Sequence, residues 1–241
     1  MHLPSPTQTL GARWPYLLAS ILSGLLLIWS ATWGYAEIIT IEPRAHLHSW
    51  ERGLKTPAPA DFDRAWSQFE TALTLNRHNA ERYLDLARLA LLKLTTEQPA
   101  SSSYSQYRQV AIDNLNLAIT HRPSWGLAWA YLAQFYASEP IQQAGLINAL
   151  ERAMELGPYE QINQRRIIPI AIAQWQRLPE RQQTALKTMM QHALRYQPNI
   201  IESIITAAIK HRWLEELLPL VNKEGHKKRV IKAMQESSTA Q

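Results

Sequence analysis

The residues of this chain whose types and spacing could do chemistry are few. His46 and His48 could hold a metal ion on one face of an extended segment, but the sequence places no third ligand near them. Glu215 and Glu216 are adjacent and point in different directions on a helix, which makes them a poor acid–base pair. We expect all four to be solvent-exposed, and the sequence predicts no catalytic residue and no metal site.

Glycine and cysteine usage excludes several classes of enzyme. Dinucleotide-binding turns, phosphate-binding loops and nucleophile elbows need glycines about two to five residues apart, because the backbone must turn sharply there. No two of the eight glycines are closer than ten residues. The chain has no Cys, no H-E-x-x-H motif and only scattered Asp, which also argues against thiolate, zincin and calcium-loop sites. The sequence therefore predicts a non-enzymatic protein without a cofactor.

Two groups of polar or aromatic residues could bind a ligand. Trp125 lies in a predicted turn, where its ring could stack on a sugar. A basic cluster in the last predicted helix could contact anionic headgroups or an acidic polysaccharide. It consists of His226, Lys227, Lys228, Arg229 and Lys232. A simple solvated surface remains the alternative for both groups. Nucleic acid is not predicted, because the net charge of +5 is small and no stacking motif accompanies it.

A candidate membrane span precedes all of these residues. Residues 16–36 contain no charged side chain. As a helix they would reach about 31 Å, close to the hydrocarbon thickness of a bilayer. Aromatic side chains, which prefer the headgroup boundary, gather at both ends of the span. They are Trp14, Tyr16, Trp29, Trp33 and Tyr35.

The fate and orientation of this span are separate questions. Residues 34–36 (Gly-Tyr-Ala) have the form of a signal-peptidase site, so cleavage is an alternative. The apolar stretch is longer than a typical signal sequence and only Arg13 is basic before it, which favours a retained anchor. One basic residue, Arg13, precedes the span, and three follow it closely: Arg44, Arg52 and Lys55. This distribution of Lys and Arg favours a cytoplasmic location for the part of the chain after the span.

The rest of the chain is predicted to be helical. Apolar residues recur at three- and four-residue steps after residue 61, which predicts about eight to ten helices. Before them, Pro43, Gly53, Pro57 and Pro59 indicate a semi-rigid linker. The predicted organisation is a short N-terminal tail (1–15), a transmembrane helix (16–36), a linker (37–60), a helical repeat domain (61–225) and a basic C-terminal helix and tail (226–241).

The predicted helix ends are themselves periodic. Three helices end on an alanine followed five residues later by a proline, at Pro123, Pro158 and Pro198. Residues 111–123 fit the pattern A-x3-F-x2-A-L-x3-P, and residues 129–136 fit W-x2-L-G/A-x2-Y. Residues 65–158 thereby resemble tetratricopeptide repeats. The resemblance implies an all-α fold in which a single transmembrane helix is followed by an α-solenoid of helix pairs.

This resemblance carries expectations for particular residues. Gly157 should end a helix in the left-handed conformation, and Pro169 should interrupt one, in a region where the repeat pattern fades. The concave face of such repeats usually binds peptides, and its polar candidates could clamp a partner segment. They are Glu81, Arg88, Gln134 and Arg165. An ordinary mixed surface is the alternative.

The whole layout has a second, finer resemblance. The span, the linker, the repeats, the segment 156–160 (Leu-Gly-Pro-Tyr-Glu) and the segment 175–178 (Trp-Gln-Arg-Leu) together resemble the VpsP-type proteins. That family implies a small membrane-anchored helical protein that accompanies bacterial exopolysaccharide synthesis and export, with its C-terminal domain outside the cytoplasm. It offers no catalytic residues to carry over.

Three functions follow as hypotheses. The first is a non-enzymatic scaffold of the bacterial inner membrane, anchored by residues 16–36, with a periplasmic domain that binds proteins of a polysaccharide synthesis or export complex and has possible polysaccharide contact. The second is a periplasmic chaperone adaptor associated with the secretion translocon. The third is an enzyme subunit whose site forms only in a complex, which no nucleophile–base constellation supports.

Overall fold

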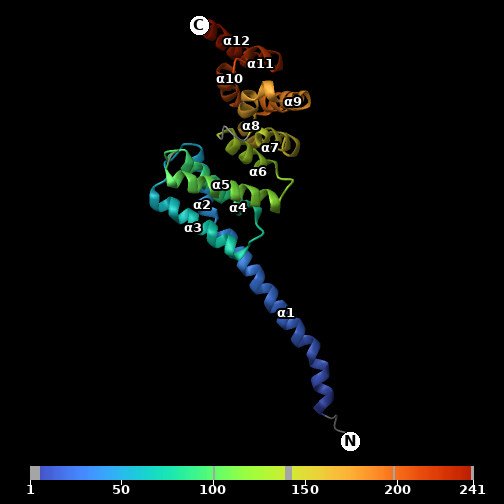
Figure 1. Cartoon of the computed structure of the whole chain (residues 1–241). Coiled ribbons are helices and arrows are strands. Elements are labelled where there is room, and N and C mark those ends of the chain that lie inside the picture. Colours follow the sequence, from blue (N-terminus) through green and yellow to red (C-terminus); the bar gives the residue numbers. More distant parts are fainter. Residues whose placement is uncertain (1–5, 100, 139–142, 198, 240–241) are drawn as a thin grey trace. The chain divides into compact units, whose positions relative to one another are not determined.

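The three- to four-residue periodicity of the chain produces helices, as Figure 1 shows for the computed structural model. The structure describes residues 6–99, 101–138, 143–197 and 199–239, and no strand occurs within these ranges. The predicted repeat proline Pro198 lies outside them, as do parts of the predicted tails. The chain divides into two units, Met1–Leu89 and Ala90–Gln241, which are described separately below.

The first unit begins with one long apolar helix. Helix α1 spans Pro6–Ile38 and is drawn in blue in Figure 1. Its large apolar side chains are exposed, for example Leu22, Leu27 and Ile28. By length and composition this helix near the N-terminus could cross a membrane, and a signal sequence would meet the same criterion. The predicted span at 16–36 lies inside α1, while its retention as an anchor stays a prediction.

Helix α2 (Ile41–Glu51) occupies 11 residues of the segment 37–60 that was predicted to be a linker. Pro43 is tolerated because it lies in the first turn, where backbone N–H groups have no helical partner. Pro43, Leu47 and Trp50 are buried on one face of α2, and the Trp50 ring stacks on Phe62 at 6.4 Å between centroids. The linker prediction is therefore wrong for these residues, because Pro43 lies in the first turn of a helix with a buried apolar face.

Two more helices follow, and the second of them extends five residues past Leu89, the end of the first unit. Gly53 follows α2 with a φ of 66°, a conformation that glycine adopts without strain. Helix α3 (Pro59–Leu75) then packs against both α1 and α2. Helix α4 (Ala80–Leu94) begins after Asn79, whose side-chain oxygen accepts a hydrogen bond from the Glu81 N–H at 3.0 Å.

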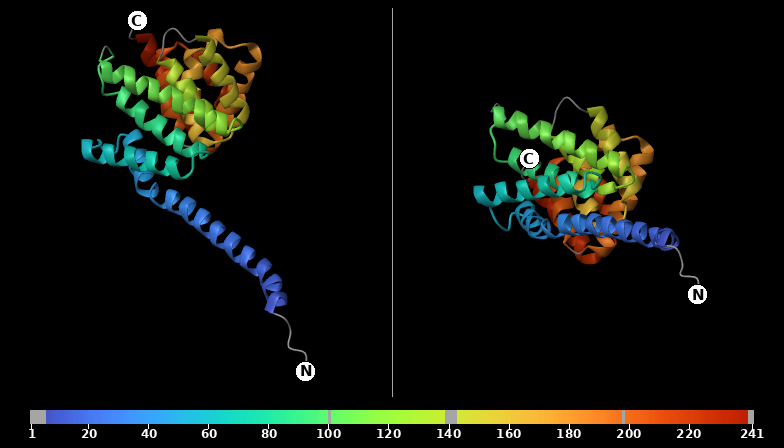
Figure 2. Two further views of the ribbon diagram at one scale, coloured as in Figure 1. Left: turned by 60° about the horizontal axis from the view of Figure 1, so that its bottom comes forward. Right: turned by 90° about the horizontal axis from the view of Figure 1, so that it is seen from below.

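The second unit is a succession of packed helices, seen together in Figure 2. They are α5 (Ser102–His121), α6 (Gly126–Ala137), α7 (Gln143–Leu156), α8 (Gln161–Ala173), the 3₁₀ turn η1 (Trp175–Arg177), α9 (Glu180–Tyr196), α10 (Ile200–Lys210), α11 (Leu214–Leu217), η2 (Leu218–Leu220) and α12 (Glu224–Thr239). Helix α6 packs against α5, α7 and α8; helix α8 packs against α7, α9 and α10. Neighbours one and two positions along the chain thus share the core.

Small residues allow the close approach of these helices. Ala133 and Ala153 are fully buried. A Cβ atom on Gly126 would lie 2.7 Å from the backbone nitrogen of Gly157, so the start of α6 meets the end of α7 without room for a side chain. A Cβ atom on Gly157 would lie 2.6 Å from Nδ2 of Asn163. Position 126 requires glycine, because the atoms that a side chain would meet there belong to the backbone.

Two details of the helix prediction are wrong. Helix α7 ends at Leu156 as expected, but Gly157 does not adopt the left-handed conformation; among the glycines described, Gly53 is the one with positive φ. Pro169 lies inside α8, which continues to Ala173. The loss of one backbone hydrogen bond is tolerated there because Ile167, Ile168 and Ala171 around it are fully buried.

Candidate functional site

A cluster of charged side chains joins the helices of the first unit. Its centre is Asp85 of α4, which is 4% exposed. Three arginines donate hydrogen bonds to its carboxylate. Arg44 Nε lies 3.0 Å and Arg82 Nη1 2.7 Å from Oδ2, and Arg88 Nη1 lies 2.9 Å from Oδ1. The spacing of Arg82, Asp85 and Arg88 along α4 places them on one side of that helix.

Each of these arginines also forms an ion pair with a glutamate. Arg82 Nη2 reaches Glu37, at the end of α1, at 2.8 Å. Arg44 Nη2 reaches Glu81 at 2.6 Å, and Arg88 grips Glu51, at the end of α2, through Nε at 3.1 Å and Nη2 at 2.6 Å. These seven residues are called the Asp85 cluster. It connects α1 and α2 to the first turns of α4.

The electrostatics of the cluster reflect its burial. Burial raises the pKa of the Asp85 carboxyl, and the guanidinium groups of Arg88, Arg44 and Arg82 oppose that shift. Arg82 is 1% exposed and keeps a buried Nε without an acceptor in the described part of the chain. Buried ion pairs contribute little net stability but are costly to break from one side. The cluster therefore fixes an arrangement of helices.

Two of the predicted partner-binding residues belong to this cluster. Glu81 pairs with Arg44, and Arg88 pairs with Glu51 and Asp85. The Arg88 side chain is 13% exposed, so it differs from the open groove residue that the repeat register suggests. Helix α2, absent from the sequence prediction, supplies the partners. Capture of another protein by these two residues stays a prediction.

The other two predicted residues lie in the second unit, in hydrogen bonds between helices. Gln134 of α6 accepts a hydrogen bond from Arg166 of α8, whose guanidinium carbon lies 3.6 Å from the ring centroid of Tyr131. Arg165 of α8 donates from Nε to Gln197 at 2.9 Å. Arg88 and Arg165 are in different units, and their shared face stays a prediction.

Arg165 starts a directional chain of hydrogen bonds. An arginine can only donate, so the Gln197 oxygen faces it and the Gln197 amide nitrogen donates to Gln164. The Gln164 nitrogen then donates to the Pro158 carbonyl at 2.7 Å and faces Nδ1 of His192 at 3.0 Å. Gln164 and Gln197 are buried, and these hydrogen bonds satisfy the polar atoms of both side chains.

The remaining predicted contact residues lie at the surface of the second unit. Trp125 precedes α6, half-buried, with the guanidinium of Arg122 at 5.0 Å from its ring centroid. The predicted basic cluster lies in α12, where Lys228 is exposed and Lys227 half-buried. Two of its members face carboxylates: Arg229 with Glu202 at 2.6 Å, and Lys232 with Glu236 at 3.6 Å.

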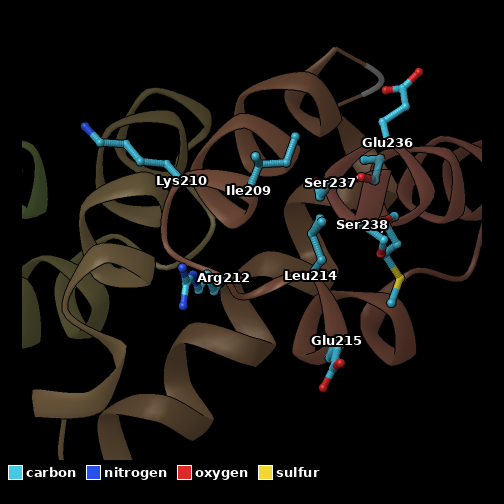
Figure 3. Close-up of a pocket in the computed structure, with 10 residues that line it drawn as sticks. Ile209, Lys210, Arg212, Leu214, Glu215, Glu236, Ser237 and Ser238 are labelled. Carbon is cyan, nitrogen blue, oxygen red and sulfur yellow. Dashed lines mark hydrogen bonds between the residues drawn. The ribbon is translucent and has the colours of Figure 1, made fainter. Parts of the chain in front are cut away.

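The end of the second unit contains a cavity of about 690 Å³, between α10, α11 and α12. Its size lies in the range of small-molecule pockets. Figure 3 shows Ile209 and Leu214 near Ser237 and Ser238 of α12. Within the described ranges, no three His, Asp or Glu side chains come together as ligands for a metal ion.

No family model matches this chain, and no curated protein is significantly similar to it in sequence. The family resemblances drawn from the sequence thus stay predictions. The candidate site rests on the geometry of the chain itself.

The Asp85 cluster is the feature that sequence reasoning missed. A signal was present: Glu81, Arg82, Asp85 and Arg88 share one face of a segment that is otherwise rich in Leu and Ala. Charges on a face that also carries apolar residues indicate a buried polar contact. Their partners could not be inferred, because they come from a helix that was read as a linker.

Proposed function

We propose that this chain is a membrane-anchored, non-enzymatic scaffold for proteins of a bacterial exopolysaccharide synthesis or export system. Helix α1 would lie in the inner membrane and the helical domain in the periplasm. The observation that carries the proposal is the Asp85 cluster, in which the end of α1 is bonded to α4 through Glu37 and Arg82.

The reason lies in what a scaffold needs. A freely tethered domain requires only a flexible linker after its anchor. Here Thr40, between α1 and α2, is fully buried, and α1, α2 and α4 are joined by charge-assisted hydrogen bonds. Such a joint holds the first helices of the domain at a defined angle to the anchor, which is useful when partners must meet at the membrane.

The packing of the second unit supports a helical-repeat surface. Helices α6, α8 and α10 contact one another in series, and α7 contacts α9. A solenoid of helix pairs would bring helices together in this order, and the extended faces of such solenoids bind partner proteins. The polysaccharide system itself is proposed from the layout and the motifs at 156–160 and 175–178 that resemble VpsP-type proteins.

A deletion strain tests the proposal. Loss of the chain should lower the amount of secreted polymer, and the full-length chain should restore it. A photo-crosslinking amino acid in place of exposed Tyr196 should capture membrane proteins of the polymer machinery, identified by mass spectrometry. The same probe at exposed Leu54, in the first unit, maps which unit is contacted. Unchanged polymer output in the deletion strain would overturn the proposal.

A further inference from the structure

A second cavity in the Ala90–Gln241 unit, of about 300 Å³, lies where η1 meets the junction of α10 and α11. Its lining is rich in hydrogen-bond donors. The residues used below are Trp175, Arg177, His211, Arg212, Trp213 and Glu216. Trp175 and Arg177 belong to the segment 175–178 that the sequence analysis singled out. The proposed scaffold role does not involve this cavity.

Arg212 has an unusual backbone for its side chain. Its φ is 53°, in the left-handed region that favours glycine. The turn is held by hydrogen bonds from the N–H of Trp213 to the Ala208 carbonyl at 2.7 Å and from the N–H of Arg212 to the Ile209 carbonyl at 3.2 Å. A residue other than glycine in this conformation is strained, and strain of this kind gathers at functional sites.

The Arg212 side chain is available to a ligand. It is exposed, and no carboxylate of the described chain pairs with it. Figure 3 shows its guanidinium directed away from Leu214 and Ser238, which line the larger cavity. The smaller cavity, which Arg212 also lines, lies at the η1 turn. A guanidinium matches the planar, two-oxygen geometry of a carboxylate.

The indole of Trp213 adds a second donor. Trp213 is 2% exposed, and its Nε1–H has no acceptor among the described residues. Such a donor is costly to leave unpaired, and Trp213 is one of the residues that line the adjoining cavity. Trp175 meets Trp213 edge to face at 5.1 Å, and the Lys187 ammonium lies 5.3 Å from the Trp175 ring centroid.

The charges around the cavity favour an anion. Arg177 and Arg212 line it with one carboxylate, Glu216, and Lys187 approaches from α9. Arg177 is held in place, because its Nη1 donates to Gln143 at 2.9 Å and to Gln174 at 3.2 Å. The site thus combines positive charge, an unused indole donor and aromatic walls, with Glu216 able to accept from a hydroxyl.

We propose that this cavity binds an acidic sugar residue of a polysaccharide, with its carboxylate on Arg212 and its ring against Trp175. A carboxylate ligand is inferred from the hydrogen-bond donors that line the cavity, whereas the choice of a sugar over a peptide rests on the proposed function. Its volume suits a single sugar unit rather than a long chain, so the polymer would be held by one residue at a time.

The test follows the indole signal of Trp213 by nuclear magnetic resonance. The full chain, labelled with ¹⁵N-tryptophan in detergent micelles, is titrated with a galacturonic acid trisaccharide, and Trp213→Phe assigns the signal. Addition of the trisaccharide should shift this signal. The neutral galactose trisaccharide, which carries a hydroxymethyl group in place of each carboxylate, should bind at least about tenfold more weakly, because charged hydrogen bonds are lost.

Arg212→Gly is the decisive variant, because glycine suits the backbone conformation. It should keep or raise the melting temperature while weakening uronate binding about tenfold. Lys210→Ala removes a neighbouring exposed cation that does not line the cavity, and should bind like wild type.

Equal affinity of the wild-type chain for the acidic and neutral trisaccharides would overturn the proposed site. Equal affinity of Arg212→Gly and wild type for the acidic trisaccharide would also overturn it. Tighter binding of an acetylated glutamate peptide would replace the sugar with a protein ligand. Absence of a shift while the deletion strain still loses polymer rejects this inference alone. Binding together with normal polymer output rejects the scaffold proposal instead.

Discussion

Asp85 accepts hydrogen bonds from three arginines with a side chain that is 5% exposed. Asp85→Asn keeps its shape but turns an amide N–H₂ toward an arginine donor. Removal of one partner from a buried ion pair costs about 3–5 kcal/mol, and we expect a loss of stability of that size. Thermal unfolding followed by circular dichroism measures it. Asp63→Asn, an exposed change on α3, should stay within about 0.5 kcal/mol of wild type.

His226 of α12 makes the stability of the second unit depend on pH. Burial lowers its pKa below the ordinary 6.5, and Lys223 and Arg229 lower it further, while Glu202 of α10 acts in the opposite sense. The unfolded chain therefore binds the proton more readily. The contribution of neutral His226 is present above pH 6.5 and declines as the pH falls from there toward the folded-state pKa.

We expect a lower melting temperature at pH 5.5 than at pH 7.5, and a smaller difference in His226→Gln. The pH values bracket the ordinary histidine pKa of about 6.5. His78→Gln, at an exposed position of the first unit, controls for the loss of an imidazole. An identical pH profile for His226→Gln and wild type would show that this ring does not titrate with folding.

Among the elements, α6 lies in a crowded environment, because α5, α7 and α8 all pack on it. Ala133 of this helix is fully buried. Ala133→Leu should overpack the contact and cost about 1–3 kcal/mol. Ala137→Leu, one turn later on the same helix and exposed, should change stability by less than about 0.5 kcal/mol. Equal melting of the two variants would contradict the repeat register.

The sequence allowed the helices to be predicted where the signals were local. The apolar stripe and the cap at Asn79 located α4, and the alanine spacing located the buried faces of α5 and α6. Helix α2 was missed because Pro43 and Gly53 resemble linker residues, although its apolar face follows a helical period. Gly157 was predicted to end a helix, but the reason lies in its approach to Gly126, which only the fold reveals.

The candidate site was less predictable than the fold. Glu81 and Arg88 were placed on a groove from the repeat register alone, whereas their partners Arg44 and Glu51 come from α2, 37 residues earlier in the chain. Arg165 and Gln134 likewise bond to residues more than thirty positions away. Long-range polar pairing of this kind depends on which helices become neighbours, and periodicity reports only which face is apolar.

At the scale of the whole molecule, the proposed role rests on the joint between α1 and the helices α2 and α4. The apolar surface of α1 is exposed along Leu17, Leu25 and Ile28, and water does not stabilise such a surface. A lipid bilayer does, provided that α1 is retained. A cleavage after Ala36 would leave Glu37 at the new N-terminus, with Arg82 still beside it.

Retention and sidedness can be measured in one strain. The chain has no cysteine, so Leu54→Cys, at a position that is 63% exposed after α2, introduces a single thiol. The retained anchor predicts full-length mass and resistance to carbonate washing. The periplasmic placement predicts labelling of this thiol by an impermeant maleimide once the outer membrane is permeabilised. A mature start at Glu37 would remove the anchor, and labelling only after lysis of the inner membrane would place the domain in the cytoplasm, as the count of Lys and Arg around the span suggests.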